Sequence, residues 1–131
     1  MPIHLEPFRD GLLVTCTGSV HIAEIMESHA AKYTSGRNSR FVLCDLTDLD
    51  ELAVTHRELA FVAIQDAKVG ARAQGIPLAV AVTRADIRRS VLEYGGNVVQ
   101  AGGGDPRWAL EVFPDMEAAK AWCLEEAVKA A

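Results

Sequence analysis

Hydrophobic residues recur along the chain with two periods, one typical of strands and the other of helices. Alternation near the start predicts a strand. An Asp-Gly pair at 10–11, suited to positive φ, then predicts a tight turn into the second arm of a hairpin. Helical spacing and continuous apolar runs follow each other along the rest of the chain. The expected strands lie at 3–8, 12–17, 40–45, 78–82 and 108–112, and the expected helices at 22–35, 56–75, 87–101 and 116–127.

The predicted order, β-β-α-β-α-β-α-β-α, is typical of an α/β protein. Strands that alternate with helices after an opening hairpin favour a mostly parallel or mixed sheet with helices packed on it. The segment 78–82 is entirely apolar, and the apolar residues within 40–45 are continuous, as expected for strands covered on both faces. The length of 131 residues is that of one domain, so we expect a single domain over 1–131.

The composition excludes some classes of partner. The net charge is −5, and the basic residues are scattered apart from a local group at Arg84, Arg88 and Arg89. A surface that follows nucleic-acid phosphates needs clustered Lys and Arg, so we expect no nucleic-acid partner. No apolar run approaches the roughly 20 residues of a membrane-spanning helix, so we expect no membrane span.

The cysteines indicate a reducing compartment. Cys16, Cys44 and Cys123 are odd in number, form no Cys-x-x-Cys motif and have apolar neighbours. Such residues are typically small buried side chains of proteins that form no disulfides. The first residues show neither the basic nor the apolar region of a secretory signal. We therefore expect a cytoplasmic protein.

The most informative segment is the acidic junction, which we define as residues 45–55 with the first turn of the following helix. A buried strand is predicted to end at Asp45, and a loop that carries Asp48, Asp50 and Glu51 then leads to the helix. Ligands and partners of open α/β sheets usually bind where strands end and helices begin. Thr55-His56-Arg57-Glu58 matches the capping box, in which a Thr and a Glu satisfy backbone N–H groups at a helix start.

Two interpretations of these acidic residues are open. Their carboxylates could hold a hard cation such as Mg²⁺, or they could form a solvated loop in which one carboxylate stabilises the helix N-terminus. The loop lacks the Gly-punctuated spacing of a calcium loop, and His21, His29 and His56 do not have the spacing of metal ligands. We expect no metal site.

A second candidate site lies where the second strand meets the first helix. Thr15, Thr17, Gly18 and Ser19 resemble the phosphate loop of flavodoxins, in which hydroxyls and N–H groups at a helix N-terminus hold the FMN phosphate. Val20 departs from that pattern. The alternative is a strand that is broken at Gly18-Ser19 and followed by a capped helix. The alternative function is therefore an FMN- or phosphate-binding protein.

Three motifs together resemble the STAS domain, the fold of the SpoIIAA-like anti-sigma-factor antagonists. Residues 11–18 (GLLVTCTG) are similar to its second strand, which ends in Gly, and 40–46 (RFVLCDL) to its central strand, which ends in Asp. Residues 112–122 (VFPDMEAAKAW) are similar to its closing strand and Asp-capped helix. In order, these motifs span nearly the whole chain.

The resemblance implies a non-enzymatic module without a cofactor, acting through a protein partner or an apolar small molecule, and a homodimer. In regulatory STAS proteins, a Ser or Thr at the start of the helix after the central strand is phosphorylated. Thr55 occupies that position here, but the Asp-Ser pair and the Gly of the usual motif are missing. Met26, Phe61 and Tyr94 are candidates to line an apolar pocket, or else to pack in the core.

Overall fold

The computed structural model describes residues 2–35, 39–68, 76–101 and 110–130. Its elements are, in chain order, β1 (Ile3–Phe8), β2 (Gly11–Cys16), β3 (Gly18–His21), α1 (Ile22–Ser35), β4 (Val42–Asp45), β5 (Leu49–Ala53), α2 (His56–Lys68), β6 (Leu78–Ala81), α3 (Ala85–Ala101), β7 (Leu110–Phe113) and α4 (Met116–Ala130). The main sheet has five strands in the order β1-β2-β4-β6-β7, and a second sheet pairs β3 with β5. The hairpin β1–β2 is antiparallel, and the other pairings are parallel.

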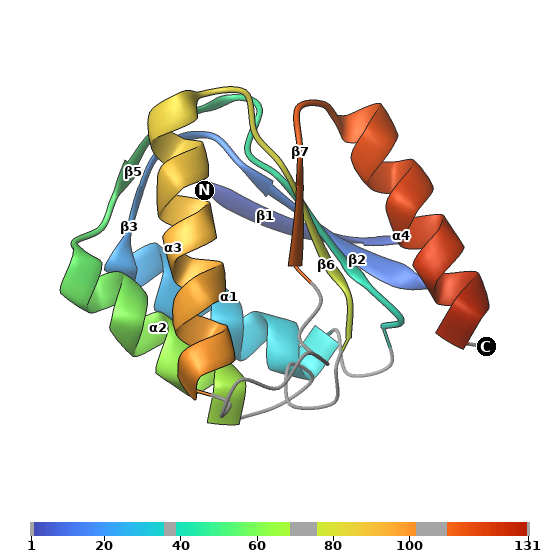
Figure 1. Cartoon of the computed structure of the whole chain (residues 1–131), viewed down its shortest axis with the longest axis horizontal. Coiled ribbons are helices and arrows are strands. Elements are labelled where there is room, and N and C mark those ends of the chain that lie inside the picture. The colour runs from blue at the N-terminus through green and yellow to red at the C-terminus, as the bar shows by residue number, and fades with distance from the viewer. Residues whose placement is uncertain (1, 36–38, 69–75, 102–109, 131) are drawn as a thin grey trace.

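Helices cover both faces of the main sheet (Figure 1), with α4 on one face and α1, α2 and α3 on the other. A buried cluster fills each interface. The cluster on the α4 side contains Phe41, Leu43, Ala79, Ala81, Ala119, Cys123 and Ala127. The cluster on the other side includes Leu12, Val14, Val42, Leu78, Val80, Ile87 and Val91. The central strands β4 and β6 thus place side chains in both clusters, which explains why both are apolar apart from Asp45 at the end of β4.

The predicted α/β class is confirmed. Helix α3 runs without interruption through Gly95-Gly96, and Asp115 caps α4 by accepting a hydrogen bond from the Ala118 N–H (2.8 Å). The sequence also predicts that Gly36 caps the end of the first helix; this residue, the expected helix end at 69–75 and the start of the expected last strand at Trp108 lie outside the described residues. Within the described ranges, the helices lack the length and the apolar character needed to cross a membrane.

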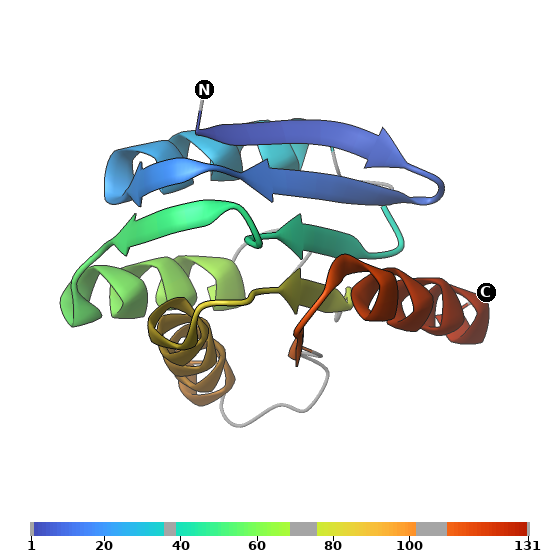
Figure 2. The ribbon, with the colours of Figure 1, turned by 90° about the horizontal axis from the view of Figure 1, so that it is seen from above.

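Two strands were not predicted. We expected Gly18-Ser19 to break the second strand and residues 45–55 to form a loop, but these segments contain β3 and β5. Figure 2 shows that β3 continues from β2 and β5 from β4, both towards the same end of the molecule. The chain bends at Gly18, whose φ is +69°, and the β3–β5 register shifts there: Gly18 pairs with Leu49 and Ser19 with Glu51. Asp50 is therefore the extra residue of a β-bulge.

The hairpin turn also differs in detail from the prediction. The Asp-Gly pair does mark the turn, but the positive φ belongs to Arg9 (52°). Gly11 is the first residue of β2 and pairs with Phe8 across the hairpin. It is buried beside the Phe41 ring, where a Cβ would overlap the ring carbons. Glycine is thus needed here for close approach to Phe41, and not for a left-handed backbone.

Candidate ligand-binding site

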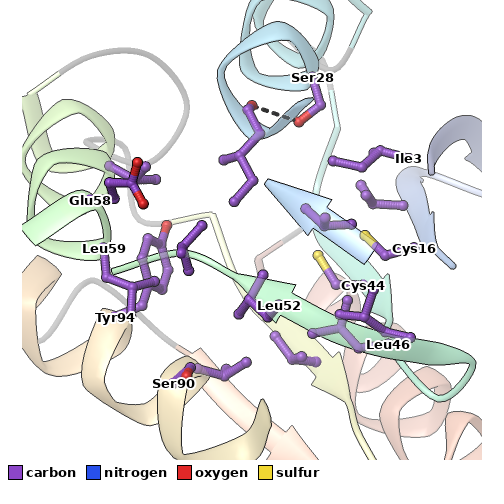
Figure 3. Close-up of a pocket in the computed structure, with 18 of the residues that line it drawn as sticks. Ile3, Cys16, Ser28, Cys44, Leu46, Leu52, Glu58, Leu59, Ser90 and Tyr94 are labelled. Atoms are coloured by element: carbon purple, nitrogen blue, oxygen red, sulfur yellow. Dashed lines mark hydrogen bonds between the residues drawn. The ribbon is translucent and has the colours of Figure 1, made fainter. Parts of the chain in front are cut away.

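A cavity of about 140 Å³ lies between the main sheet, the β3–β5 sheet and helices α1, α2 and α3 (Figure 3). The described residues that line it are Ile3, Val14, Cys16, Val20, Ile25, Ser28, Cys44, Leu46, Leu49, Leu52, Val54, Glu58, Leu59, Val62, Leu78, Val80, Ser90, Val91 and Tyr94. Its walls are mostly aliphatic. Many of the lining side chains are only half-buried, so the cavity is accessible to solvent.

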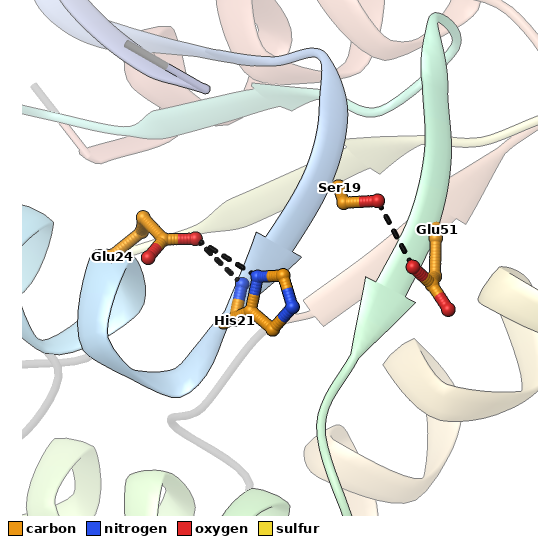
Figure 4. A network of polar contacts seen from close by, with 4 residues as sticks. All are labelled: Ser19, His21, Glu24 and Glu51. Atoms are coloured by element: carbon orange, nitrogen blue, oxygen red, sulfur yellow. Dashed lines mark hydrogen bonds and ion pairs between the residues drawn. The ribbon is translucent and has the colours of Figure 1, made fainter.

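The bend in the sheet builds one wall of this cavity. Because side chains alternate along a strand, β3 and β5 present an apolar face inward and a polar face outward. Val20 and Leu52, which pair across the two strands, both line the cavity. On the outer face, the Ser19 hydroxyl donates a hydrogen bond to Glu51 Oε1 (2.9 Å), as Figure 4 shows. The bulge at Asp50 turns Leu49 inward as well, so two leucines of β5 line the cavity.

Few polar groups reach the cavity. The Ser28 hydroxyl donates to the backbone oxygen of Ile25 (2.8 Å), which satisfies it within α1. The Tyr94 hydroxyl donates to the Asp66 carboxylate, which is 2 % exposed, and this bond joins α3 to α2. Glu58 is half-buried in the first turn of α2. The cavity therefore combines an apolar interior with a small number of fixed polar groups, the usual character of a small-molecule site.

The cysteines differ in location, and all carry thiols that form no disulfide. Cys16 and Cys44 line the cavity from β2 and β4 (Figure 3). Cys123 belongs to the cluster on the α4 side, where burial raises the pKa of its thiol to about 12. Neighbouring Cys44 and Glu126 make smaller contributions to this same rise in the pKa, because negative charge there disfavours a second anion.

The raised pKa of Cys123 predicts a loss of stability in alkali. The unfolded thiol loses its proton near its ordinary pKa of about 9, whereas the folded thiol keeps it until about 12. The contribution of this thiol is fully present below pH 9, and the free energy of unfolding falls as the pH rises towards 12. Urea unfolding across this range should give a shallower pH dependence for Cys123→Ala. If the free energy of unfolding fell equally steeply with pH in both proteins, the raised pKa of Cys123 would not be the cause.

The structure does not gather the acidic junction into a metal site. Asp45 Oδ1 accepts hydrogen bonds from the Thr47 N–H (3.0 Å) and hydroxyl (2.6 Å), which closes the turn after β4. Glu51 is bonded to Ser19 on the outer face, and Asp48 and Asp50 are exposed. Among the described residues, no three carboxylate, imidazole or thiol groups lie close enough together to hold a metal ion.

Thr55 and Glu58 form the capping box that the sequence indicates. The Glu58 N–H donates to Thr55 Oγ1 (3.1 Å), and the Thr55 N–H donates to Glu58 Oε1 (2.8 Å). Beside them, exposed His56 contacts Glu93 of α3, with 2.7 Å between Nδ1 and Oε1. The Thr55 hydroxyl is thus used at the start of α2, and phosphorylation of this residue stays a prediction.

The role of Thr55 can be tested by substitution. Thr55→Ala should lower the free energy of unfolding by about 1 kcal/mol, the typical effect of losing an N-cap oxygen. Thr55→Ser keeps that oxygen and should stay close to the native value. Chemical denaturation of the three proteins measures the difference. An alanine variant as stable as the native protein would show that the cap contributes nothing.

Residues 15–19 are arranged differently from a flavodoxin phosphate loop. That loop leads directly into a helix whose N–H groups hold the phosphate, whereas here Gly18 and Ser19 are part of strand β3, which continues to His21 before α1 begins. The start of α1 is capped by Glu24, whose Oε1 accepts the His21 N–H (2.9 Å; Figure 4). Thr15 is half-buried in β2, and the Thr17 N–H donates to the Pro2 oxygen (2.9 Å). This geometry gives the FMN alternative no support.

Sequence reasoning identified part of the cavity. Tyr94 lines it, but Met26 is not among its described lining residues and Phe61 is 49 % exposed on α2. The leucines of the acidic junction were missed. They recur every third residue, at 46, 49 and 52, between acidic neighbours. That recurrence is the signal that could have shown an apolar face within the predicted loop.

Comparisons with known proteins agree with this architecture. No family model and no curated protein matches the chain. Among solved structures, the chain is similar to an uncharacterized protein of the DUF3478 family, with a SpoIIAA-like fold, from Shewanella loihica PV-4. The TM-score is 0.52 at 16 % sequence identity, over 92 % of this chain and 91 % of the other. The chain thus has a SpoIIAA-like fold, as the resemblance to STAS domains implied.

Proposed function

We propose that this protein is a non-enzymatic module that binds a small apolar molecule in the cavity and acts through protein contacts. The observation that supports the proposal is the aliphatic lining of the cavity, contributed by both sheets and three helices. An apolar cavity open to solvent leaves hydrophobic surface in contact with water. A ligand that covers this surface gains about 25 cal/mol for each Å² of apolar area removed from water.

The volume limits the size of the ligand. An engineered apolar cavity of roughly 150 Å³ in another protein binds benzene, and the present one is of similar size at about 140 Å³. The ligand is therefore of the order of one aromatic ring or a short alkyl chain. For so few atoms, dissociation constants of about 10 μM to 1 mM are expected.

The acidic junction supports the regulatory half of the proposal. β5 carries Leu49 and Leu52 on the cavity side and Glu51 on the outer side. A ligand that contacts the leucines therefore touches the same strand that a protein partner would meet from outside. Ligand binding can change the affinity for the partner only if β5 has two conformations and the ligand binds one of them more tightly.

Nuclear magnetic resonance (NMR) of the methyl groups provides a direct test. We expect toluene to shift the methyl signals of Leu52, Val80 and Val91, with saturation at millimolar concentration or below. Ala127, on the α4 side, serves as the internal reference because it lies across the sheet. Signals that fail to saturate, or that shift equally on both faces, would rule out binding in the cavity.

Native mass spectrometry of protein taken from cells would identify a co-purifying ligand and report whether the chain is a homodimer.

A further inference from the structure

We propose that the cavity selects an apolar molecule with a protonated amine as its head group and rejects one with a carboxylate. This inference rests on the proposed function, because it assumes that the cavity holds a ligand. It goes beyond that function by assigning the charge of the ligand. The basis is the side chains around the cavity: Glu58 contributes a carboxylate, and no Lys, Arg or His is found among its described lining residues.

Glu58 is held in place by the backbone. Its Oε1 accepts the Thr55 N–H (2.8 Å), and its own N–H donates to Thr55 Oγ1 (3.1 Å). A carboxylate can accept about four hydrogen bonds, so this bond leaves capacity for an ammonium donor. Because the capping box already restricts the side chain, a ligand would lose little additional conformational freedom in pairing with it.

The surroundings of Glu58 also favour a cation. Figure 3 shows Glu58 and Tyr94 on the same side of the cavity, opposite Ile3 and Cys16. An aromatic face attracts an ammonium group, and Tyr94 is fixed by its hydrogen bond to Asp66. The net charge of −5 raises the local concentration of cations and lowers that of anions. An anionic head group would instead meet a like charge next to apolar walls that screen it poorly.

Three ligands of nearly equal size and shape separate charge from hydrophobicity: 2-phenylethylamine, 2-phenylethanol and phenylacetate. At neutral pH they carry a positive charge, no charge and a negative charge. Titration calorimetry or methyl NMR should rank their affinities in that order. We expect the amine to bind about threefold tighter than the alcohol, and the carboxylate to bind about tenfold weaker than the alcohol.

Glu58→Gln isolates the charge, because Gln at this helix position also completes a capping box. The variant should bind the alcohol as the native protein does, lose the preference for the amine and bind phenylacetate better. Glu117→Gln is the matched control: it removes the same charge from the first turn of α4, on the other face of the sheet. It should leave the order of the three affinities, and the ratios between them, unchanged.

The outcomes distinguish the two proposals. If none of the three molecules binds, the cavity has no ligand-binding function and both proposals fail. If the alcohol binds but the amine binds no tighter, or phenylacetate binds equally well, the charge inference is overturned while the proposed function stands. The same holds if Glu58→Gln preserves the native ratio of amine to carboxylate affinity, or if Glu117→Gln alters it as much.

Discussion

Replacing Gly11 with alanine is expected to lower the free energy of unfolding by about 1–3 kcal/mol, the range typical of overpacked cores. A Cβ at this buried position would overlap the ring of Phe41. That ring is fully buried and lies edge-on to Phe8, with their centroids 6.2 Å apart. It cannot move away without disturbing the packing of the hairpin against β4. Urea unfolding followed by circular dichroism measures the effect.

Gly96→Ala provides the matched control, because it makes the same chemical change without the overlap. Gly96 is exposed in α3, and a Cβ there would meet nothing within 4 Å. Alanine is favoured over glycine in a helix by up to about 1 kcal/mol, so this variant should be more stable than the native protein. If both substitutions changed stability in the same direction, close approach to Phe41 would not be the reason for glycine at position 11.

The order of strands and helices was predictable because each long element carries its own periodic signal. The run from Val42 to Cys44 is apolar since β4 is covered by α4 on one face and by α1, α2 and α3 on the other. The capping box at Thr55 and the cap at Asp115 are local interactions, so a few consecutive residues suffice to predict them. The parallel register, in contrast, depends on segments far apart in the chain and could not be predicted.

β3 and β5 escaped prediction for a physical reason. Each strand is short, β3 begins with Gly18, and the bulge at Asp50 disrupts the alternation that would identify β5. Their pairing joins residues 18–21 to residues 49–53, so neither strand has a local partner. A short segment rich in acidic residues has a low propensity for strands on its own, and here the tertiary pairing overrides it.

The candidate site was predictable only in its position. The prediction singled out the segment after β4, but it rested on the acidic side chains, of which Glu51 lies on the outer face. The cavity lies on the inner face of the same segment, where Leu49 and Leu52 meet residues from α2 and α3. Its walls come from segments spread between Ile3 and Tyr94, and such a convergence leaves no compact motif in the sequence.

Cys44→Phe should reduce the affinity for toluene at least about tenfold, because the new ring would occupy the cavity as a ligand does. Cys44 lines the cavity from β4, and Figure 3 shows its thiol among the other lining side chains. The added ring would be buried against Leu46, Leu49 and Val80, so stability should be unchanged or raised. Methyl NMR titration and urea unfolding measure the two effects.

Cys44→Ala distinguishes loss of space from loss of the thiol, because it removes the sulfur and enlarges the cavity. This variant should still bind toluene, at some loss of stability from the larger cavity. Binding that survives in Cys44→Phe would place the ligand elsewhere. Binding lost in both variants would show that the thiol, and not the volume, determines affinity. Loss in the phenylalanine variant alone would make the cavity enclosed by the bent sheet the binding site.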